Sequence, residues 1–243
     1  MKTADINDID RTRYKGHLSL CEIDLEGQRR LRRTRVLVVG AGGLGSPVCL
    51  YLGAAGVGTI GVVDPDDVSL SNLQRQIMHG TPDIGTPKTL SARRAVERIN
   101  PEVEVETIRE FLTEENAARI IGAYDIVVDC TDNLGARLVI DDTCHALGKP
   151  YVFGAVRRWG GQLFTYLPGH AGYRDIFAPD PDTAPDDLPC AIDGVLNTVV
   201  GVVGTLQATE VVKWAVGTGD LLTDTLLTFD AITMTFARFS LGN

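Results

Sequence analysis

Three glycines, Gly40, Gly42 and Gly45, have the spacing G-x-G-x-x-G directly after the apolar run 36–39. Valines dominate this run, which predicts a buried strand, and the glycines lead into a helix expected from about Leu44 to Ala55. Residues without a Cβ allow the backbone to approach a phosphate closely, and the start of a helix presents free N–H groups to it. This stretch therefore predicts a site for the phosphates of a nucleotide.

An acidic residue, Asp64, ends a second predicted strand over 59–64. It lies 24 residues after Gly40, close to the place where a Rossmann-type unit has an acid that binds a ribose. The glycine loop and Asp64 alone would fit an NAD-dependent oxidoreductase as well as any other nucleotide-binding protein. That alternative stays open on these two features.

Further charged side chains follow at Arg75, Lys88 and Asp132. A nucleoside triphosphate carries more negative charge than the pyrophosphate of a dinucleotide, so extra cations and an acid able to hold Mg²⁺ suit it. We expect Thr86 to cap a helix that runs to Ile99, which puts Lys88 in the first turn. A cation there opposes the helix dipole, and this misfit favours a functional role for Lys88.

Several sequence blocks resemble the ThiF/MoeB/HesA family, the bacterial relatives of ubiquitin-activating enzymes, and the resemblance runs from about Arg13 to Phe239. The blocks are GAGGLGSP, VVDPDDVSLSNLQRQ, IGTPK, DCTDN and GVVGTLQATEVVK. The resemblance implies ATP-dependent adenylation of the C-terminal glycine carboxylate of a small ubiquitin-like sulfur carrier ending in Gly-Gly, with release of pyrophosphate. Such a carboxylate is already ionised near neutral pH, so no base is needed, and the four histidines (17, 79, 145 and 170) lie outside every motif.

The resemblance also implies the residues that bind ATP and Mg²⁺. The implied nucleotide site consists of Gly40, Gly42, Gly43 and Gly45 in the loop, Asp64 on the ribose, Asn72, Arg75, Gln76 and Lys88 on the phosphates, together with Asp66 and Asn133. Asp132 is expected to hold Mg²⁺. Cys190 matches the cysteine that some members use to form a thioester or acyl-disulfide with the carrier. The expected catalytic residues are therefore Arg75, Lys88, Asp132 and Cys190.

The N-terminal segment 1–34 is expected to be a polar arm that, by the resemblance, crosses a homodimer and supplies an arginine to the partner's ATP site. That arginine belongs to an R-Y-x-R segment, which here reads Arg13-Tyr14-Lys15-Gly16. The glycine raises the alternative of a degenerate, non-catalytic relative that still binds a carrier. Asp132 and Lys88, both present, favour the active enzyme.

A second departure concerns zinc and sulfur transfer. Many members of the family bind structural zinc through two C-x-x-C pairs, and the place of the first pair here is 172–175, which contains no cysteine. We therefore expect a zinc-less branch with no zinc site. The chain also ends after the activating domain without a rhodanese-like domain, so a separate sulfur donor is expected.

Composition narrows the class of protein further. The formal net charge of −9 argues against nucleic acid as a partner. The first ten residues contain no apolar segment typical of a signal peptide, and the five cysteines are widely spaced, which favours the cytoplasm. The long apolar stretch 195–216 is interrupted by polar residues, so a buried helix is favoured over a membrane span.

The order of predicted elements indicates an α/β fold. Strands and helices alternate up to about residue 150, and strands followed by one long helix come after them. This order predicts a Rossmann-like, doubly wound, mostly parallel sheet continued by antiparallel strands at one side. We expect one ATP-binding adenylation domain over 35–243, with a mobile crossover loop at about 168–193.

Overall fold

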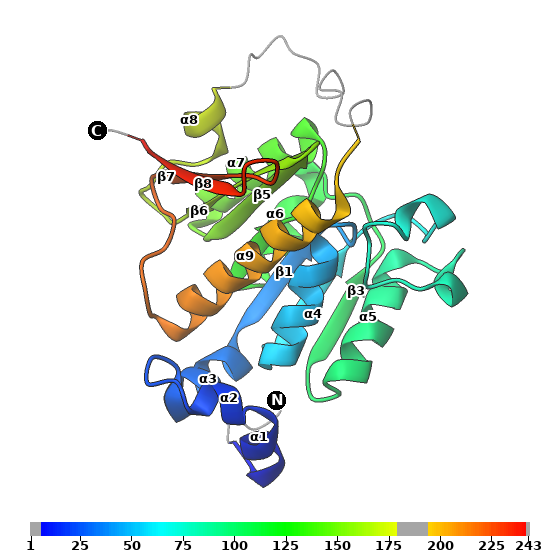
Figure 1. Ribbon diagram of the computed structural model, residues 1–243, viewed down its shortest axis with the longest axis vertical. Coiled ribbons are helices and arrows are strands. Elements are labelled where there is room, and N and C mark those ends of the chain that lie inside the picture. The colour runs from blue at the N-terminus through cyan, green and yellow to red at the C-terminus, as the bar shows by residue number, and fades with distance from the viewer. Residues whose placement is uncertain (1–5, 179–193, 242–243) are drawn as a thin grey trace.

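The computed structural model describes residues 6–178 and 194–241, and its eight strands form one sheet (Figure 1). The strand order is β3-β2-β1-β4-β5-β6-β7-β8. The first five strands are parallel, and the last three add to one edge in antiparallel fashion. Their bounds are β1 Arg35–Val39, β2 Thr59–Val63, β3 Glu104–Ile108, β4 Ile126–Asp129, β5 Tyr151–Arg157, β6 Gly160–Tyr166, β7 Thr225–Asp230 and β8 Thr235–Ser240. The predicted fold class is confirmed.

Helices cover both faces of the parallel part. One face carries α4 (Gly45–Ala55), α5 (Lys88–Ile99) and α9 (Asn197–Val216), and the other carries α6 (Glu114–Gly122) and α7 (Leu134–Leu147). Strand β1 contributes Val36 and Val38 to the first core and Leu37 and Val39 to the second. Because both faces are buried, residues 36–39 of the strand are all apolar rather than alternating with polar ones.

Helix α9 is the long apolar stretch of the sequence. Among the described helices it alone is long and apolar enough to cross a membrane, yet half of its most apolar window is buried in the protein. It packs against α4, β5 and β6, and Gln207 donates from Nε2 to the backbone oxygen of Asp129 at 2.7 Å. The prediction of a buried helix is therefore confirmed.

The arm folds onto the rest of the same chain as α1 (Asp8–Arg13), α2 (Lys15–Leu18) and α3 (Asp24–Arg33). Arg13 donates to the backbone oxygen of Ile99 at 2.8 Å, and Asn100 donates to the hydroxyl of Tyr14 at 2.8 Å. Both partners precede β3, so the arm lies at the amino ends of the parallel strands, at the bottom of Figure 1. The glycine loop follows β1 and lies at the opposite, carboxyl end.

Two local expectations need correction. Helix α5 begins at Lys88 with Pro87 as its N-cap, so Thr86 is not the cap, although Lys88 is in the first turn as predicted. The long loop 65–87 contains two short 3-10 helices, η1 (Leu70–Asn72) and η2 (Thr81–Asp83). The predicted crossover loop contains a short helix, α8 (Tyr173–Phe177), and its residues 179–193 lie outside the described chain.

Candidate functional site

The glycine loop joins β1 to α4 and leaves a row of backbone donors unused. Across the described chain, the N–H groups of residues 42–45 find no acceptor. The first turn of a helix cannot satisfy these groups internally, and together with the helix dipole they attract an anion. The loop therefore has the backbone chemistry of a phosphate site.

The four glycines of this loop are required for different reasons. Gly40 has φ +100°, and a Cβ there would lie 2.7 Å from the backbone oxygen of Cys130. A Cβ at Gly43 would lie 2.7 Å from Val200 of α9, and one at Gly45 would collide with the Gly40 carbonyl. At Gly42, by contrast, the nearest atom is Nε2 of Gln76 at 3.5 Å, an ordinary contact. Packing therefore explains why three of these positions are glycine. At Gly42 packing does not require a glycine, and the missing side chain leaves room for a ligand to approach the backbone closely.

Asp64 lies directly after β2 and holds the glycine loop in place. Its carboxylate accepts the N–H of Ala41 at 2.8 Å and the N–H of Asp66 at 2.9 Å. Burial raises the pKa of Asp64, and the nearby Lys88 ammonium opposes that shift. The predicted ribose acid therefore also fixes the loop, because both of its oxygens already accept a backbone donor.

Lys88 lies between two acids at the start of α5. Its Nζ is 2.8 Å from Oδ2 of Asp66 and 3.8 Å from Oδ1 of Asp64. The lysine side chain is 8% exposed, whereas that of Asp66 is 60% exposed. A phosphate that displaced the exposed Asp66 would find a largely desolvated cation, for which charge-assisted hydrogen bonds are strong.

The loop that contains SNLQRQ lies against the glycine loop. The aliphatic carbons of Arg75 come within 3.7 Å and 3.8 Å of the Cβ position of Gly43, and its guanidinium has one long bond, 3.3 Å to the backbone oxygen of Ser71. Gln76 is buried beside Gly42, and its Oε1 has no hydrogen-bond partner in the described chain. Asn72 uses its Oδ1 to accept the N–H of Ser69. An under-used guanidinium and an orphaned amide oxygen both fit a polar ligand at this place.

Asp132 and Asn133 follow β4, the neighbour of β1 in the sheet. Asn133 caps α7 by accepting the N–H of Ala136 at 2.8 Å, while Asp132 is exposed and finds no partner among the described residues. Asn133 therefore stabilises the start of the helix, while the carboxylate of Asp132 is available to a ligand. A free carboxylate at the carboxyl end of a central strand has the chemistry to bind Mg²⁺.

The structure thus brings together most of the predicted site, while Cys190 lies outside the described residues. Contacts join the glycine loop to Asp64, Arg75, Gln76 and, through Asp64, to Lys88 and Asp66. Sequence reasoning missed His79, which bonds the glycine loop, and Ser91, which bonds His79. Only the position of His79, three residues after the SNLQRQ motif, could have pointed to it.

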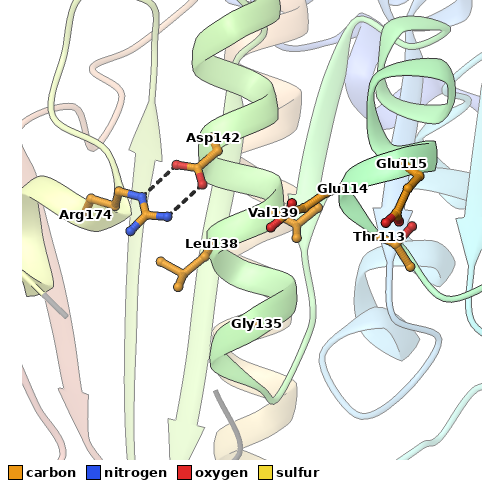
Figure 2. A pocket seen from close by; sticks show the side chains of 8 residues that line it. All are labelled: Thr113, Glu114, Glu115, Gly135, Leu138, Val139, Asp142 and Arg174. Atoms are coloured by element: carbon orange, nitrogen blue, oxygen red, sulfur yellow. Dashed lines mark hydrogen bonds and ion pairs between the residues drawn. The ribbon is translucent and has the colours of Figure 1, made fainter. Parts of the chain in front are cut away.

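A separate hollow of about 460 Å³ lies between the start of α6, α7 and α8 (Figure 2). Arg174 and Asp142 face each other across part of it and form two bonds of 2.7 Å, so the guanidinium is already neutralised. Glu114 and Glu115 add negative charge at the opposite side. None of the predicted site residues lines this hollow, and its acids make it unsuitable for phosphates.

Comparison with known proteins places these features in a family. The ThiF family profile matches residues 14–243. The chain is 44% identical to "SAMP-activating enzyme E1" of Haloferax volcanii, over 96% of this chain and 86% of that protein. It is 43% identical to "Sulfur carrier protein adenylyltransferase" of Thermus thermophilus (94% and 86%) and to "Probable molybdopterin-synthase adenylyltransferase" of Porphyra purpurea (95% and 60%). The chain thus spans about three fifths of the Porphyra relative.

Solved structures show the same fold at lower identity. PaaA superposes with a TM-score of 0.80 at 22% identity, covering 99% of this chain and 76% of that one. Escherichia coli MccB, in a structure with ATP, gives a TM-score of 0.76 at 21% identity, covering 89% and 66%. The fold is thus shared with these proteins, and the match over residues 14–243 shows that the chain belongs to the ThiF family.

Proposed function

We propose that this protein is an adenylyltransferase that uses ATP to activate the C-terminal carboxylate of a small ubiquitin-like sulfur carrier. The observation that carries the proposal is the convergence of one loop with unused N–H groups, the paired cation Lys88 and the free acid Asp132 at the same end of the sheet. Relatives that span nearly the whole chain are named for sulfur-carrier or SAMP activation.

The chain's own residues would hold ATP by charge neutralisation. The N–H groups of residues 42–45, which have no acceptor in the described chain, would donate to a phosphate. Arg75 and Lys88 would supply cations, and the exposed Asp66 would release Lys88 to the ligand. Asp64 would hold the ribose, while Asn72, Gln76 and Asn133 are the remaining polar groups of the proposed nucleotide site. Mg²⁺ on Asp132 would offset the charge of the phosphates and of the leaving pyrophosphate.

The proposed adenylation requires that the carboxylate and ATP be positioned against each other, and it requires no general base. The glycine carboxylate of the carrier is ionised near neutral pH, so it can attack the α-phosphate directly, and the obstacle is repulsion between two anions. Preorganised N–H groups and cations remove that obstacle, and orientation in the site supplies the rest. The arrangement therefore suits adenylation without a histidine at the reacting atoms.

Membership in the family decides against the NAD-dependent oxidoreductase, which rested only on the glycine loop and Asp64. We further propose a carrier ending in Gly-Gly, a separate sulfur donor, a homodimer, a cytoplasmic location and no zinc site. Cys190 would form the covalent link to the carrier. A degenerate relative that only binds the carrier remains the alternative outcome of the test below.

The test is carrier-dependent exchange of pyrophosphate into ATP in the presence of Mg²⁺. Asp132→Ala and Lys88→Ala should each lower exchange by about 100-fold or more while far-UV circular dichroism stays unchanged, because each removes charge stabilisation from the transferring phosphate. Asp142→Ala is the matched control and should exchange at the wild-type rate, since Arg174 is the one ion-pair partner of Asp142 among the described residues. Full exchange in Asp132→Ala would overturn the assignment, and no exchange in the wild type would favour the degenerate relative.

A further inference from the structure

His79 is a buried side chain that no part of the proposed reaction uses. It is 6% exposed and follows the SNLQRQ loop, to which its N–H is tied through the backbone oxygen of Gln76 at 3.0 Å. Its Nε2 lies 2.9 Å from the backbone oxygen of Ala41 in the glycine loop. The histidine therefore reaches from one loop of the nucleotide site to the backbone of the other.

The bond to Ala41 fixes the direction of a neighbouring donor. No peptide bond is cis in the described chain, and in a trans peptide the C=O and the next N–H point in opposite directions. Because the Ala41 carbonyl points at His79, the Gly42 N–H must point away from it. Asp64 holds the other peptide of Ala41 by accepting its N–H at 2.8 Å. Two side chains thus fix Ala41, and the Gly42 N–H, which has no partner in the described chain, is aimed as a consequence.

The second ring nitrogen sets the tautomer that this bond requires. A carbonyl oxygen only accepts, so Nε2 must carry the hydrogen, and Nδ1 of the neutral ring accepts from Oγ of Ser91 at 2.8 Å. Ser91 is nearly completely buried in α5, three residues after Lys88. The cation and the loop donor are therefore positioned from the same helix.

We propose that His79 is a positioning residue that aims the Gly42 N–H at the phosphates of ATP. The inference rests on the proposed use of ATP at this site. It assigns His79 no contact with ATP: its effect passes through the Ala41 carbonyl. Two substitutions test the two hydrogen bonds of the ring one at a time. A glutamine amide reaches the place of Nε2 and can keep the bond to Ala41, whereas an asparagine amide reaches the place of Nδ1 and can keep the bond to Ser91.

The experiment measures the Kd for ATP·Mg²⁺ by titration calorimetry without carrier, and the KM for ATP in the exchange assay. His79→Asn keeps an acceptor for Ser91 and loses the bond to Ala41, so the Kd and KM for ATP should rise about 2- to 10-fold, the effect of one hydrogen bond. The KM for the carrier should not change. His79→Gln restores the donor to Ala41 and should recover wild-type ATP affinity even if both variants melt at the same lowered temperature.

His170→Asn is the matched control, since His170 pairs with Asp224 outside the site, and it should bind ATP as the wild type does. Ser91→Ala is the milder variant to use if His79→Asn fails to fold, and it should raise the Kd about 2-fold. Wild-type affinity in His79→Asn or Ser91→Ala, or an equal loss in His79→Asn and His79→Gln, would overturn the positioning role. A wild-type protein that fails to bind ATP would instead refute the proposed function.

Discussion

Gly42 and Gly45 differ in what a single added methyl group would disturb. At Gly42 the new Cβ meets only the Nε2 of Gln76 at 3.5 Å, whereas at Gly45 it runs into the backbone oxygen of Gly40. A side-chain amide can move, but a backbone carbonyl fixed by the loop cannot do so without distorting it. The same substitution should therefore affect ligand binding at one position and folding at the other.

We expect Gly42→Ala to keep the wild-type melting temperature and to lose at least about 10-fold in ATP affinity, because the methyl group occupies the place of approach of a phosphate. Gly45→Ala should lower the free energy of unfolding by about 1–3 kcal/mol, the usual effect of overpacking. Thermal denaturation and ATP titration of both variants check this. A destabilised Gly42→Ala with unchanged ATP affinity would contradict our account of the loop.

His79 should also contribute to the pH dependence of the free energy of unfolding. Burial lowers its pKa from the ordinary 6.5, assisted by Lys88 and opposed by the Ala41 bond, Asp83 and Asp64. Below about pH 6.5 His79 is therefore protonated in the unfolded chain while it is still neutral in the folded chain. The free energy of unfolding consequently falls as the pH falls from 6.5 toward the pKa of His79 in the folded state. Above 6.5 this contribution is fully present.

The measurement is urea unfolding at pH 7.5 and 5.5 for the wild type and for His79→Gln, which has no ring to titrate. The wild type should lose more free energy of unfolding over this interval than the variant does. Equal losses in the two proteins would show that the folded ring titrates as freely as the unfolded one.

At the scale of elements, the sequence was sufficient to predict those features that depend on residues close together in the chain. Residues 36–39 of β1 are all apolar because the strand is buried on both faces. Helix α7 is bounded by residues next to it in the chain: Asn133 caps its start, and Gly148 adopts the left-handed conformation at its end. The spacing from Gly40 to Asp64 also placed both at one sheet end. Each of these features depends on residues close in the chain or on a known strand-loop-helix unit.

Features that depend on distant partners were not predictable in this way. Helix α8 was missed because Asp141 of α7, 32 residues away, holds its first turn by accepting the N–H of Tyr173. His79 was missed because its partner Ala41 is 38 residues away. Asp64 was assigned to a ribose, but its bonds to Ala41 and Asp66 are visible only in the folded loop.

Asp141 gives a prediction about how α8 is anchored to α7. Its buried carboxylate accepts from Tyr151 Oη at 2.6 Å, Tyr173 N at 3.0 Å and Arg174 N at 3.1 Å. Asp141→Ala leaves Tyr151 Oη and Arg174 N without this acceptor, whereas Tyr173 N keeps the hydroxyl oxygen of Tyr151 at 2.8 Å. The substitution should lower the free energy of unfolding by at least about 2 kcal/mol. The neighbouring Asp142→Ala breaks only an exposed pair with Arg174 and should lose at most about 1 kcal/mol.

Urea unfolding of the two variants tests this anchor, and elemental analysis of the purified protein should find no stoichiometric zinc. Equal stability of Asp141→Ala and Asp142→Ala would show that the cluster does not hold the segment. One zinc per chain would show that a metal does so instead.

At the scale of the whole molecule, the arm and the proposed nucleotide site lie at opposite ends of the sheet. Arg13 is tied to Ile99 ahead of β3, and the glycine loop follows β1 at the carboxyl end. An arginine of the arm therefore cannot serve the site of its own subunit. If the arm contributes to catalysis, it does so across the proposed homodimer.

Gly16 is the place to test that contribution, because nothing lies within 4 Å of its Cβ position and an arginine can be added without a clash. A charge-assisted bond from a guanidinium to a phosphate contributes about 1.5–3 kcal/mol, or roughly 10- to 100-fold in affinity. Gly16→Arg should therefore lower the KM for ATP in the exchange assay. Arg13→Ala should be the more damaging change if Arg13 already substitutes, although it also removes the bond to Ile99.

Mixed dimers decide whether the arm acts in the partner. A subunit that carries both Gly16→Arg and Asp132→Ala has no active site, but its arm can serve a wild-type partner, so this dimer should show the lowered KM for ATP. In the reciprocal dimer, one subunit carries Gly16→Arg and the other Asp132→Ala. Its active site then receives an arm with Gly16, and the KM should remain that of the wild type.

The opposite pattern would mean that the arm reaches its own site, which the bond from Arg13 to Ile99 forbids in the present fold. Identical KM values in both dimers and in Gly16→Arg itself would mean that the arm contributes only to packing at the amino ends of the strands.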